Sequence, residues 1–131
     1  MSKKIMVVDD EQETLAYIKL GLEMCGYEVI AISNSLHALD LAKSMKPDML
    51  ILDFMMPGLD GFDIYTGLNA SKETMDIPII FITGHMIPEV TERMLQTKAF
   101  CYLSKPFDIS DLTDRISDAL SLRTTSSNKK A

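Results

Sequence analysis

The sequence predicts an α/β fold: a five-stranded parallel sheet in the order 2-1-3-4-5, with five helices on both faces. Five short apolar segments alternate with five amphipathic segments, which is typical of a parallel sheet covered by helices. The chain has 131 residues, 47% of them hydrophobic and 24% charged, as in an ordinary soluble domain. Right-handed crossovers and short connections leave few strand orders open, and the flavodoxin-like order is the one we expect.

The predicted strands are short apolar runs over residues 5–8, 27–32, 49–53, 77–82 and 99–103. The third run, Met49–Asp53, is apolar up to a terminal carboxylate, as expected for a strand buried on both faces of the sheet. Pro78 lies near the start of the fourth run, where a missing N–H is tolerated.

The predicted helices cover residues 12–26, 35–45, 61–70, 88–97 and 108–122. In the first, Gly26 has the position of a C-terminal glycine, and Pro47 follows the end of the second. Spacings of three and four predict the buried faces. The residues expected to face inward include Leu15, Ile18, Leu22, Cys25, Leu36, Leu39, Leu41, Ile64, Leu68, Val90, Met94, Ile109, Leu112, Ile116, Ala119 and Leu120.

Residues 1–122 are predicted to form one domain, and 123–131 a flexible polar tail or the start of a linker, because the tail has no apolar periodicity. The formal charge is −6, and three of the 13 basic residues lie in that tail, so the domain itself is more acidic. Such a surface disfavours direct binding to nucleic acid or to anionic membranes.

The sequence has no apolar run long enough to cross a bilayer and no signal-peptide core, so we expect a cytoplasmic protein. Cys25 and Cys101 lack metal or redox spacing and are expected to be small buried thiols.

Polar residues lie where the predicted strands end. Asp9 and Asp10 follow the first strand, Asp53 ends the third, Thr83 follows the fourth and Lys105 follows the fifth. Because the carboxyl ends of parallel strands lie at one edge of the sheet, three acids, a hydroxyl and an ammonium should meet there. Acids after a strand can simply offset the dipole of the next helix, but all of these groups together indicate a site.

Crowded carboxylates repel one another, which raises their pKa values unless a cation lies between them. Oxygen ligands with retained water favour Mg²⁺ over zinc or copper. A site of this kind suits phosphoryl transfer, with Asp53 as nucleophile and with Mg²⁺, Lys105 and the Thr83 hydroxyl each facing one phosphoryl oxygen.

The chain resembles the receiver domains of response regulators in two-component signalling, including the single-domain chemotaxis regulators. The matching motifs are VVDDE at 7–11, LDFMMPGLDG at 52–61, ITG at 82–84 and YLSKPF at 102–107. The resemblance spans residues 4–122.

The resemblance implies that Asp53 accepts a phosphoryl group from a phosphohistidine of a sensor histidine kinase or a histidine phosphotransfer protein. It implies that Asp10, Asp53 and the backbone carbonyl of Met55 bind Mg²⁺ directly, with Asp9 acting through water. It also implies a cis bond before Pro106.

On phosphorylation, by the same resemblance, Thr83 moves toward the phosphoryl group and Tyr102 rotates inward. The face formed by the predicted helix 88–97, strand 99–103 and helix 108–122 then changes its affinity for a downstream protein or output domain. The domain would be a monomer or a phosphorylation-dependent dimer, and not an enzyme that turns over an external substrate.

Some positions depart from the usual pattern of the family. Lys98 stands where glycine is common, and Phe100 and Cys101 replace a polar pair. Phe100 would either be exposed on the output face or pack beneath the helix 88–97. Met55 and His85 lie two residues after Asp53 and Thr83, positions that tune hydrolysis of the aspartyl phosphate in the family.

Three alternatives are open. A flavodoxin-type cofactor binder would need a phosphate-binding loop where this chain has Asp9-Asp10-Glu11. A phosphatase of the haloacid-dehalogenase kind would need a second Asp where this chain has Met55. A receiver used purely for docking would have no need of the acidic, hydroxyl and lysine set.

Overall fold

The computed structural model describes the backbone of residues 2–130 and the side chains of residues 2–122. Its strands are β1 (Lys4–Val8), β2 (Glu28–Ile32), β3 (Met49–Asp53), β4 (Ile79–Thr83) and β5 (Cys101–Ser104). Its helices are α1 (Gln12–Met24), the 3₁₀ turn η1 (Ser35–His37), α2 (Ala38–Met45), α3 (Gly61–Asn69), α4 (Pro88–Leu95) and α5 (Ile109–Lys130).

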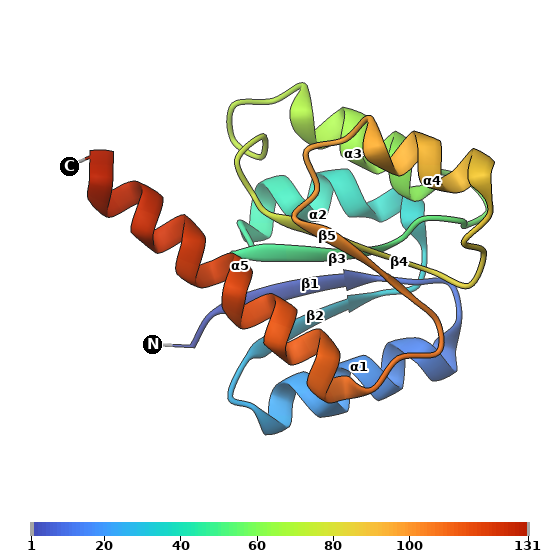
Figure 1. The fold of residues 1–131 in the computed structure, drawn as a ribbon, viewed down its shortest axis with the longest axis horizontal. Coiled ribbons are helices and arrows are strands. Elements are labelled where there is room, and N and C mark those ends of the chain that lie inside the picture. Colours follow the sequence, from blue (N-terminus) through green and yellow to red (C-terminus); the bar gives the residue numbers. More distant parts are fainter. Residues whose placement is uncertain (1, 131) are drawn as a thin grey trace.

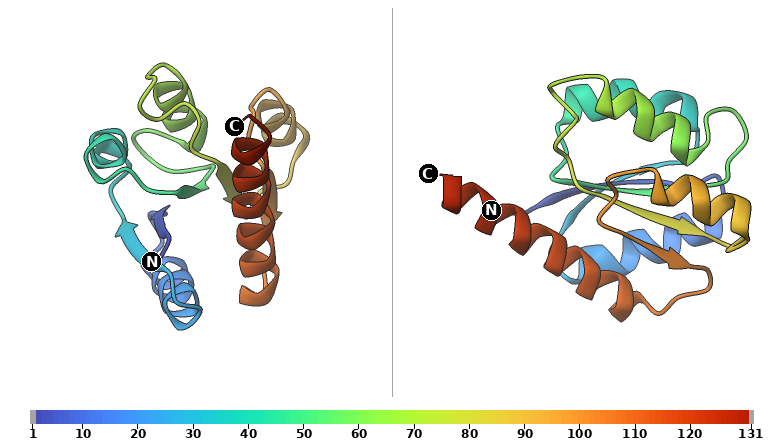
Figure 2. Two further views of the ribbon diagram at one scale, coloured as in Figure 1. Left: turned by 90° about the vertical axis from the view of Figure 1, so that its left-hand side faces the viewer. Right: turned by 45° about the horizontal axis from the view of Figure 1, so that its top comes forward.

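The strands form one parallel sheet in the order β2-β1-β3-β4-β5, which confirms the predicted topology. Helices α2, α3 and α4 cover one face of the sheet, and α1 and α5 cover the other (Figures 1 and 2). All parallel strands therefore end at one edge, with Val8 paired to Leu52 and Thr83 to Ser104. This edge collects the polar residues that follow each strand.

Two apolar cores hold the layers together. One lies between the sheet and α2, α3 and α4 and includes Leu52 and Phe81, and the other lies under α1 and α5 and includes Ile51 and Ile18. Every residue of β3 is buried, because neighbouring strands flank it and helices cover both its faces. The apolar run that led to this strand assignment is thus explained by its central position.

The last helix is longer than predicted. The structure continues α5 to Lys130, whereas the sequence indicated a helix that ends at residue 122 and a tail without regular structure. Figure 1 shows this end of α5 projecting from the body of the domain. Apolar periodicity indicates the buried face of a helix, and residues 123–130 have no such periodicity, so the sequence did not mark these turns as helical. The domain boundary at 122 stays a prediction.

The second helical segment also differs from the prediction. It starts as the 3₁₀ turn η1, where the side chain of Asn34 accepts a hydrogen bond from the Leu36 amide. Leu36 is 60% exposed and does not face inward. Lys46, with φ +50°, ends α2 just before Pro47, and Gly26, with φ +91°, follows α1.

The predicted surroundings of three side chains need correction. Cys25 is exposed: α1 ends at Met24, so Cys25 is the C-cap and lies beyond the last buried residue of the helix, Leu22. Cys101 is half-buried. Phe100 is also half-buried, but it packs against the core under α1 and α5 and not beneath α4.

Among the described residues, no helix combines the length and the apolar character that crossing a bilayer requires.

Candidate phosphoacceptor site

The carboxyl edge of the sheet brings the predicted groups together. Asp9 follows β1, Asp53 is the last residue of β3, and Lys105 follows β5. The Lys105 ammonium lies 3.0 Å from an oxygen of Asp9 and 3.1 Å from an oxygen of Asp53. The Lys105 amide also donates to the carbonyl of Thr83, at 2.7 Å, which fixes the lysine backbone beside the end of β4.

Asp53 is buried but reachable. Only 5% of its side chain is exposed, yet it lines a cleft of about 800 Å³ together with Asp10, Met55, His85 and Lys105. The cleft is bounded on its other side by α1 and the loop after β5. A carboxylate in this position is held rigidly by its strand and still faces an open space large enough for a small phosphorylated group.

Burial, and after it the charge of Asp9, raise the pKa of Asp53 from its ordinary value of 3.8 to about 7. The Lys105 ammonium and the Met55 amide, which donates to Asp53 at 3.2 Å, oppose this shift. The carboxylate is therefore a weaker acid than a surface aspartate, and a nearby cation would favour its ionised form.

Asp9 is completely buried. One of its oxygens accepts a hydrogen bond from the Glu11 amide at 2.9 Å. The other lies beside Lys105 but has no well-directed hydrogen bond among the described residues. A buried carboxylate oxygen in this condition can accept a further cation or a bound water.

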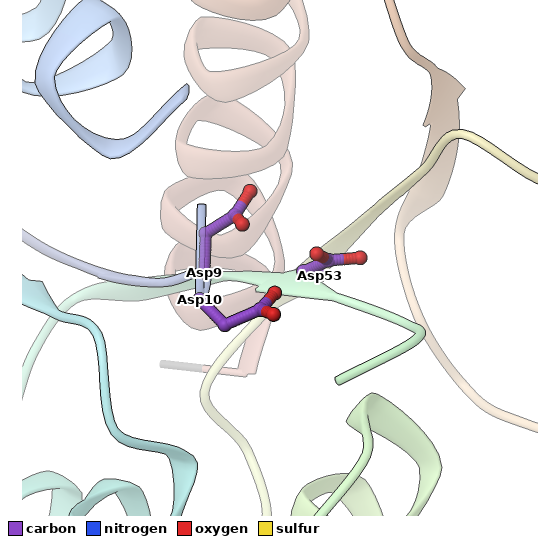
Figure 3. A group of neighbouring side chains, drawn as sticks. All are labelled: Asp9, Asp10 and Asp53. Carbon is purple, nitrogen blue, oxygen red and sulfur yellow. The ribbon is translucent and has the colours of Figure 1, made fainter. Parts of the chain in front are cut away.

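The carboxylates of Asp9, Asp10 and Asp53 form a cluster with one oxygen from each within 4.8 Å of the others (Figure 3). Asp10 is exposed to the cleft, while Asp9 and Asp53 are buried beside it. Hard oxygen donors that remain open to water on one side suit Mg²⁺. The residues present therefore fit a magnesium ion.

The other predicted residues surround this cluster. Thr83 is fully buried, and its hydroxyl accepts a hydrogen bond from the His85 amide at 3.0 Å. Met55 is 44% exposed at the cleft, where His85 is also exposed. Tyr102 is 37% exposed on β5, so its ring lies outside the core. The bond between Lys105 and Pro106 is cis.

Sequence reasoning assigned no role to Glu11, although its carboxylate makes the shortest contact with Lys105, at 2.6 Å. This contact lowers the pKa of Glu11. Burial alone would lower the pKa of Lys105, but the hydrogen bond to Glu11 and the nearby carboxylates of Asp9 and Asp53 raise it. The signal in the sequence was a third acid directly after the Asp9-Asp10 pair.

Tyr17 was also missed. Its hydroxyl donates to the Phe107 carbonyl at 3.4 Å and accepts from the Ile109 amide at 3.0 Å. These bonds join α1 to the loop that contains Lys105. Nothing in the sequence indicates this contact, because Tyr17 lies on the exposed side of an amphipathic helix.

Comparison with known proteins assigns the family. Residues 5–117 match the family described as "Response regulator receiver domain". This chain belongs to the response regulator receiver domain family. A receiver domain accounts for the acidic edge without the cofactor binding or the phosphatase activity of the first two alternatives.

Two relatives differ in how much of their length this receiver covers. It is 34% identical to the phosphate regulon transcriptional regulatory protein PhoB of Pseudomonas aeruginosa over 92% of the chain, and this match covers 52% of PhoB. It is 31% identical to the polar-differentiation response regulator DivK of Brucella anthropi, with 92% of the chain and 98% of DivK covered. The receiver thus spans about half of the former and nearly all of the latter.

A solved structure has the same fold. The receiver domain of the sensor histidine kinase PA1611 from Pseudomonas aeruginosa, solved with a magnesium ion in its active-site cleft, superimposes with a TM-score of 0.86. The two are 25% identical, and the match covers 92% of this chain and 99% of that one.

Proposed function

We propose that this receiver accepts a phosphoryl group on Asp53 from a phosphohistidine in a Mg²⁺-dependent reaction. The main support is the 3.1 Å contact between Lys105 and Asp53 at the floor of an open cleft that also contains Asp10. A nucleophilic carboxylate, a fixed ammonium and further acids for a metal are the groups that transfer of a phosphoryl group to a carboxylate requires.

The proposed ligands of Mg²⁺ are Asp10, Asp53 and the backbone carbonyl of Met55, with Asp9 acting through water. Bound there, the ion would neutralise charge on one phosphoryl oxygen. The acidic cluster and the partly unsatisfied oxygen of Asp9 support this assignment.

In the proposed transfer, an oxygen of Asp53 attacks phosphorus while the bond between phosphorus and the imidazole nitrogen of the donor breaks. The electron pair of that bond returns to the imidazole. Lys105 faces a second phosphoryl oxygen, and the Thr83 hydroxyl moves toward a third. Hydrolysis reverses the modification: water attacks phosphorus, the bond to Asp53 breaks, and the carboxylate and inorganic phosphate are released.

The proposed output is a change in the face formed by α4, β5 and α5. When Thr83 turns toward the phosphoryl group, it leaves space that the ring of Tyr102 fills by rotating inward. The exposure of Tyr102 in this structure supports an outward starting position for that rotation. A downstream protein or output domain would then bind one of the two states more tightly.

The proposed donor is a sensor histidine kinase or a histidine phosphotransfer protein in the cytoplasm. The receiver would act as a monomer or as a phosphorylation-dependent dimer, without direct contact to nucleic acid or membrane. Its formal net charge of −6 supports the absence of direct binding to nucleic acid or to anionic membranes.

The test is treatment with acetyl phosphate or beryllofluoride plus Mg²⁺. The wild type should gain the mass of one phosphoryl group, or shift its amide resonances with beryllofluoride, and Asp53→Ala should do neither. Asp76→Asn is the control, because it removes an exposed acid that is not part of the cleft. A wild type that remains unmodified would leave the docking-only alternative as the better account.

A further inference from the structure

Ser35 joins two loops that are distant in sequence. It is the first residue of η1, and it is buried, with 3% of its surface exposed. Its hydroxyl donates to the carbonyl of Pro57 and accepts from the amide of Leu59, both at 3.1 Å. One side chain thus satisfies an acceptor and a donor of the loop between β3 and α3.

That loop contains the carbonyl of Met55, which is a proposed ligand of Mg²⁺. Before Met55 the loop is fixed by Phe54, whose amide and carbonyl both make backbone hydrogen bonds and whose ring is buried. At its far end the loop is fixed by Asp60 and Asp63, which form a capping box at the start of α3. Ser35 holds the stretch between these two anchors.

This middle stretch needs such a tether because of Gly58. Its φ of +82° lies in the left-handed region, and glycine adopts positive and negative φ about equally readily. A Cβ at Gly58 would lie 3.2 Å from the Ser35 hydroxyl, so the two residues are in close approach. Without the hydroxyl, the Pro57 carbonyl and the Leu59 amide would lose these bonds beside a residue with wide backbone freedom.

From this geometry we infer that Ser35 is a positioning residue for the metal site, acting through the loop between β3 and α3 on the carbonyl of Met55. The inference rests on the proposed function, because it concerns the proposed Mg²⁺ ligand. Removal of the hydroxyl should broaden the conformations of Pro57–Leu59 and weaken Mg²⁺ binding, although Ser35 touches neither the ion nor the phosphoryl group.

Ser35→Ala tests this, with Thr74→Val as the matched control. Thr74 is also a buried hydroxyl, 1% exposed, and it donates to the Leu68 carbonyl at 2.7 Å in the connection between α3 and β4, outside the cleft. Each variant loses one buried hydroxyl that makes a hydrogen bond to the backbone, so both should lose stability. A purely structural role for Ser35 would leave the Mg²⁺ affinity of the two variants alike.

Two measurements separate the outcomes. In metal-free protein, exchange of the Leu59 amide followed by NMR should be at least about tenfold faster in Ser35→Ala than in wild type, and unchanged in Thr74→Val. Calorimetric titration should show a Kd for Mg²⁺ about three- to tenfold higher in Ser35→Ala and unchanged in Thr74→Val. If Ser35→Ala does not fold, Ser35→Cys replaces it, since a thiol is a weaker hydrogen-bonding group of similar shape.

Mg²⁺ binding to the wild type distinguishes an error in this inference from an error in the proposed function. If wild type binds Mg²⁺ and Ser35→Ala binds it equally well, or if its Leu59 amide stays protected, the inference is wrong and the proposed function stands. If wild type itself does not bind Mg²⁺, the proposed function has failed first, and the inference fails with it.

Discussion

The ammonium of Lys105 lies closer to Glu11, at 2.6 Å, than to Asp53, at 3.1 Å. An ammonium has three N–H donors, and in this structure three carboxylates, those of Glu11, Asp9 and Asp53, surround it. A phosphoryl oxygen that approaches Lys105 therefore has to displace one of them. Glu11 is the partner that returns to water most easily, since its side chain is 60% exposed.

We predict that Glu11→Gln binds beryllofluoride about two- to fivefold more tightly than wild type, in keeping with the small free energy of an exposed ion pair. Titration with beryllofluoride at fixed Mg²⁺ measures this. Glu13→Gln is the matched control, because Glu13 is exposed in the same cleft and makes no described contact with Lys105. Equal affinity in all three proteins would show that Glu11 does not compete for the lysine.

A second prediction concerns pH in the absence of metal. The pKa of Asp53 is raised from 3.8 to about 7 in the folded protein, so between these values the folded state keeps a proton that the unfolded chain has released. The free energy of unfolding therefore falls as pH rises through this interval, by no more than about 4 kcal/mol.

Asp53→Asn removes that titration, so the variant should gain stability over wild type at about pH 8 and little at about pH 4.5. Urea unfolding with a chelator present, at both pH values, is the measurement. Asp76→Asn should show no such difference, because Asp76 is exposed. The same wild-type-to-variant difference at both pH values would contradict the prediction.

A third prediction concerns the lifetime of the phosphorylated state. Met55 places a bulky apolar side chain at the cleft beside Asp53. In Met55→Asn a smaller polar group would admit and orient water, so autodephosphorylation should be severalfold faster. Loss of the phosphoryl group is followed over time by mass spectrometry after removal of acetyl phosphate. Met75→Asn is the control, because Met75 is an exposed methionine outside the cleft, and it should lose the phosphoryl group at the wild-type rate. An unchanged rate in Met55→Asn would show that Met55 does not limit autodephosphorylation.

A fourth prediction concerns Arg93 of α4. Its guanidinium lies 3.2 Å from Asp60, and 5.2 Å and 4.9 Å from the ring centres of Phe54 and Phe62. Arg93→Met should lower the free energy of unfolding by about 1–2 kcal/mol, the sum expected for one partly exposed ion pair and two cation–π contacts. Arg93→Lys keeps the charge but not the planar stacking, so its loss should be smaller. Urea unfolding distinguishes the three proteins, and equal stability would refute the assignment.

The sequence was informative where burial and chain direction decide the structure. The apolar run that ends at Asp53 suited a strand buried on both faces, and Asp9, Thr83 and Lys105, each at or just after the end of a parallel strand, were expected to share an edge. The conformations of long side chains were not predictable in this way. Two examples are the ion pair between Lys105 and Glu11 and the hydrogen bonds of Ser35 with Pro57 and Leu59. They depend on how loops are placed, and apolar periodicity carries no information about loops.

The sequence also predicted exposed parts of helices poorly. Leu36 was expected to face inward because it is apolar, but η1 turns it outward. The length of α5 beyond residue 122 was missed because no apolar stripe marks helical turns that lie away from the core.

The pairing of Glu11 with Lys105 joins residues 94 positions apart in the chain. A fragment that ends before β5, whether a proteolytic product or a polypeptide still emerging from the ribosome, has the nucleophile but lacks the cation that faces it. In the function that we propose, reaction with a small phosphodonor would therefore require that the last strand has joined the sheet. Incorporation of the phosphoryl group would then report the docking of β5.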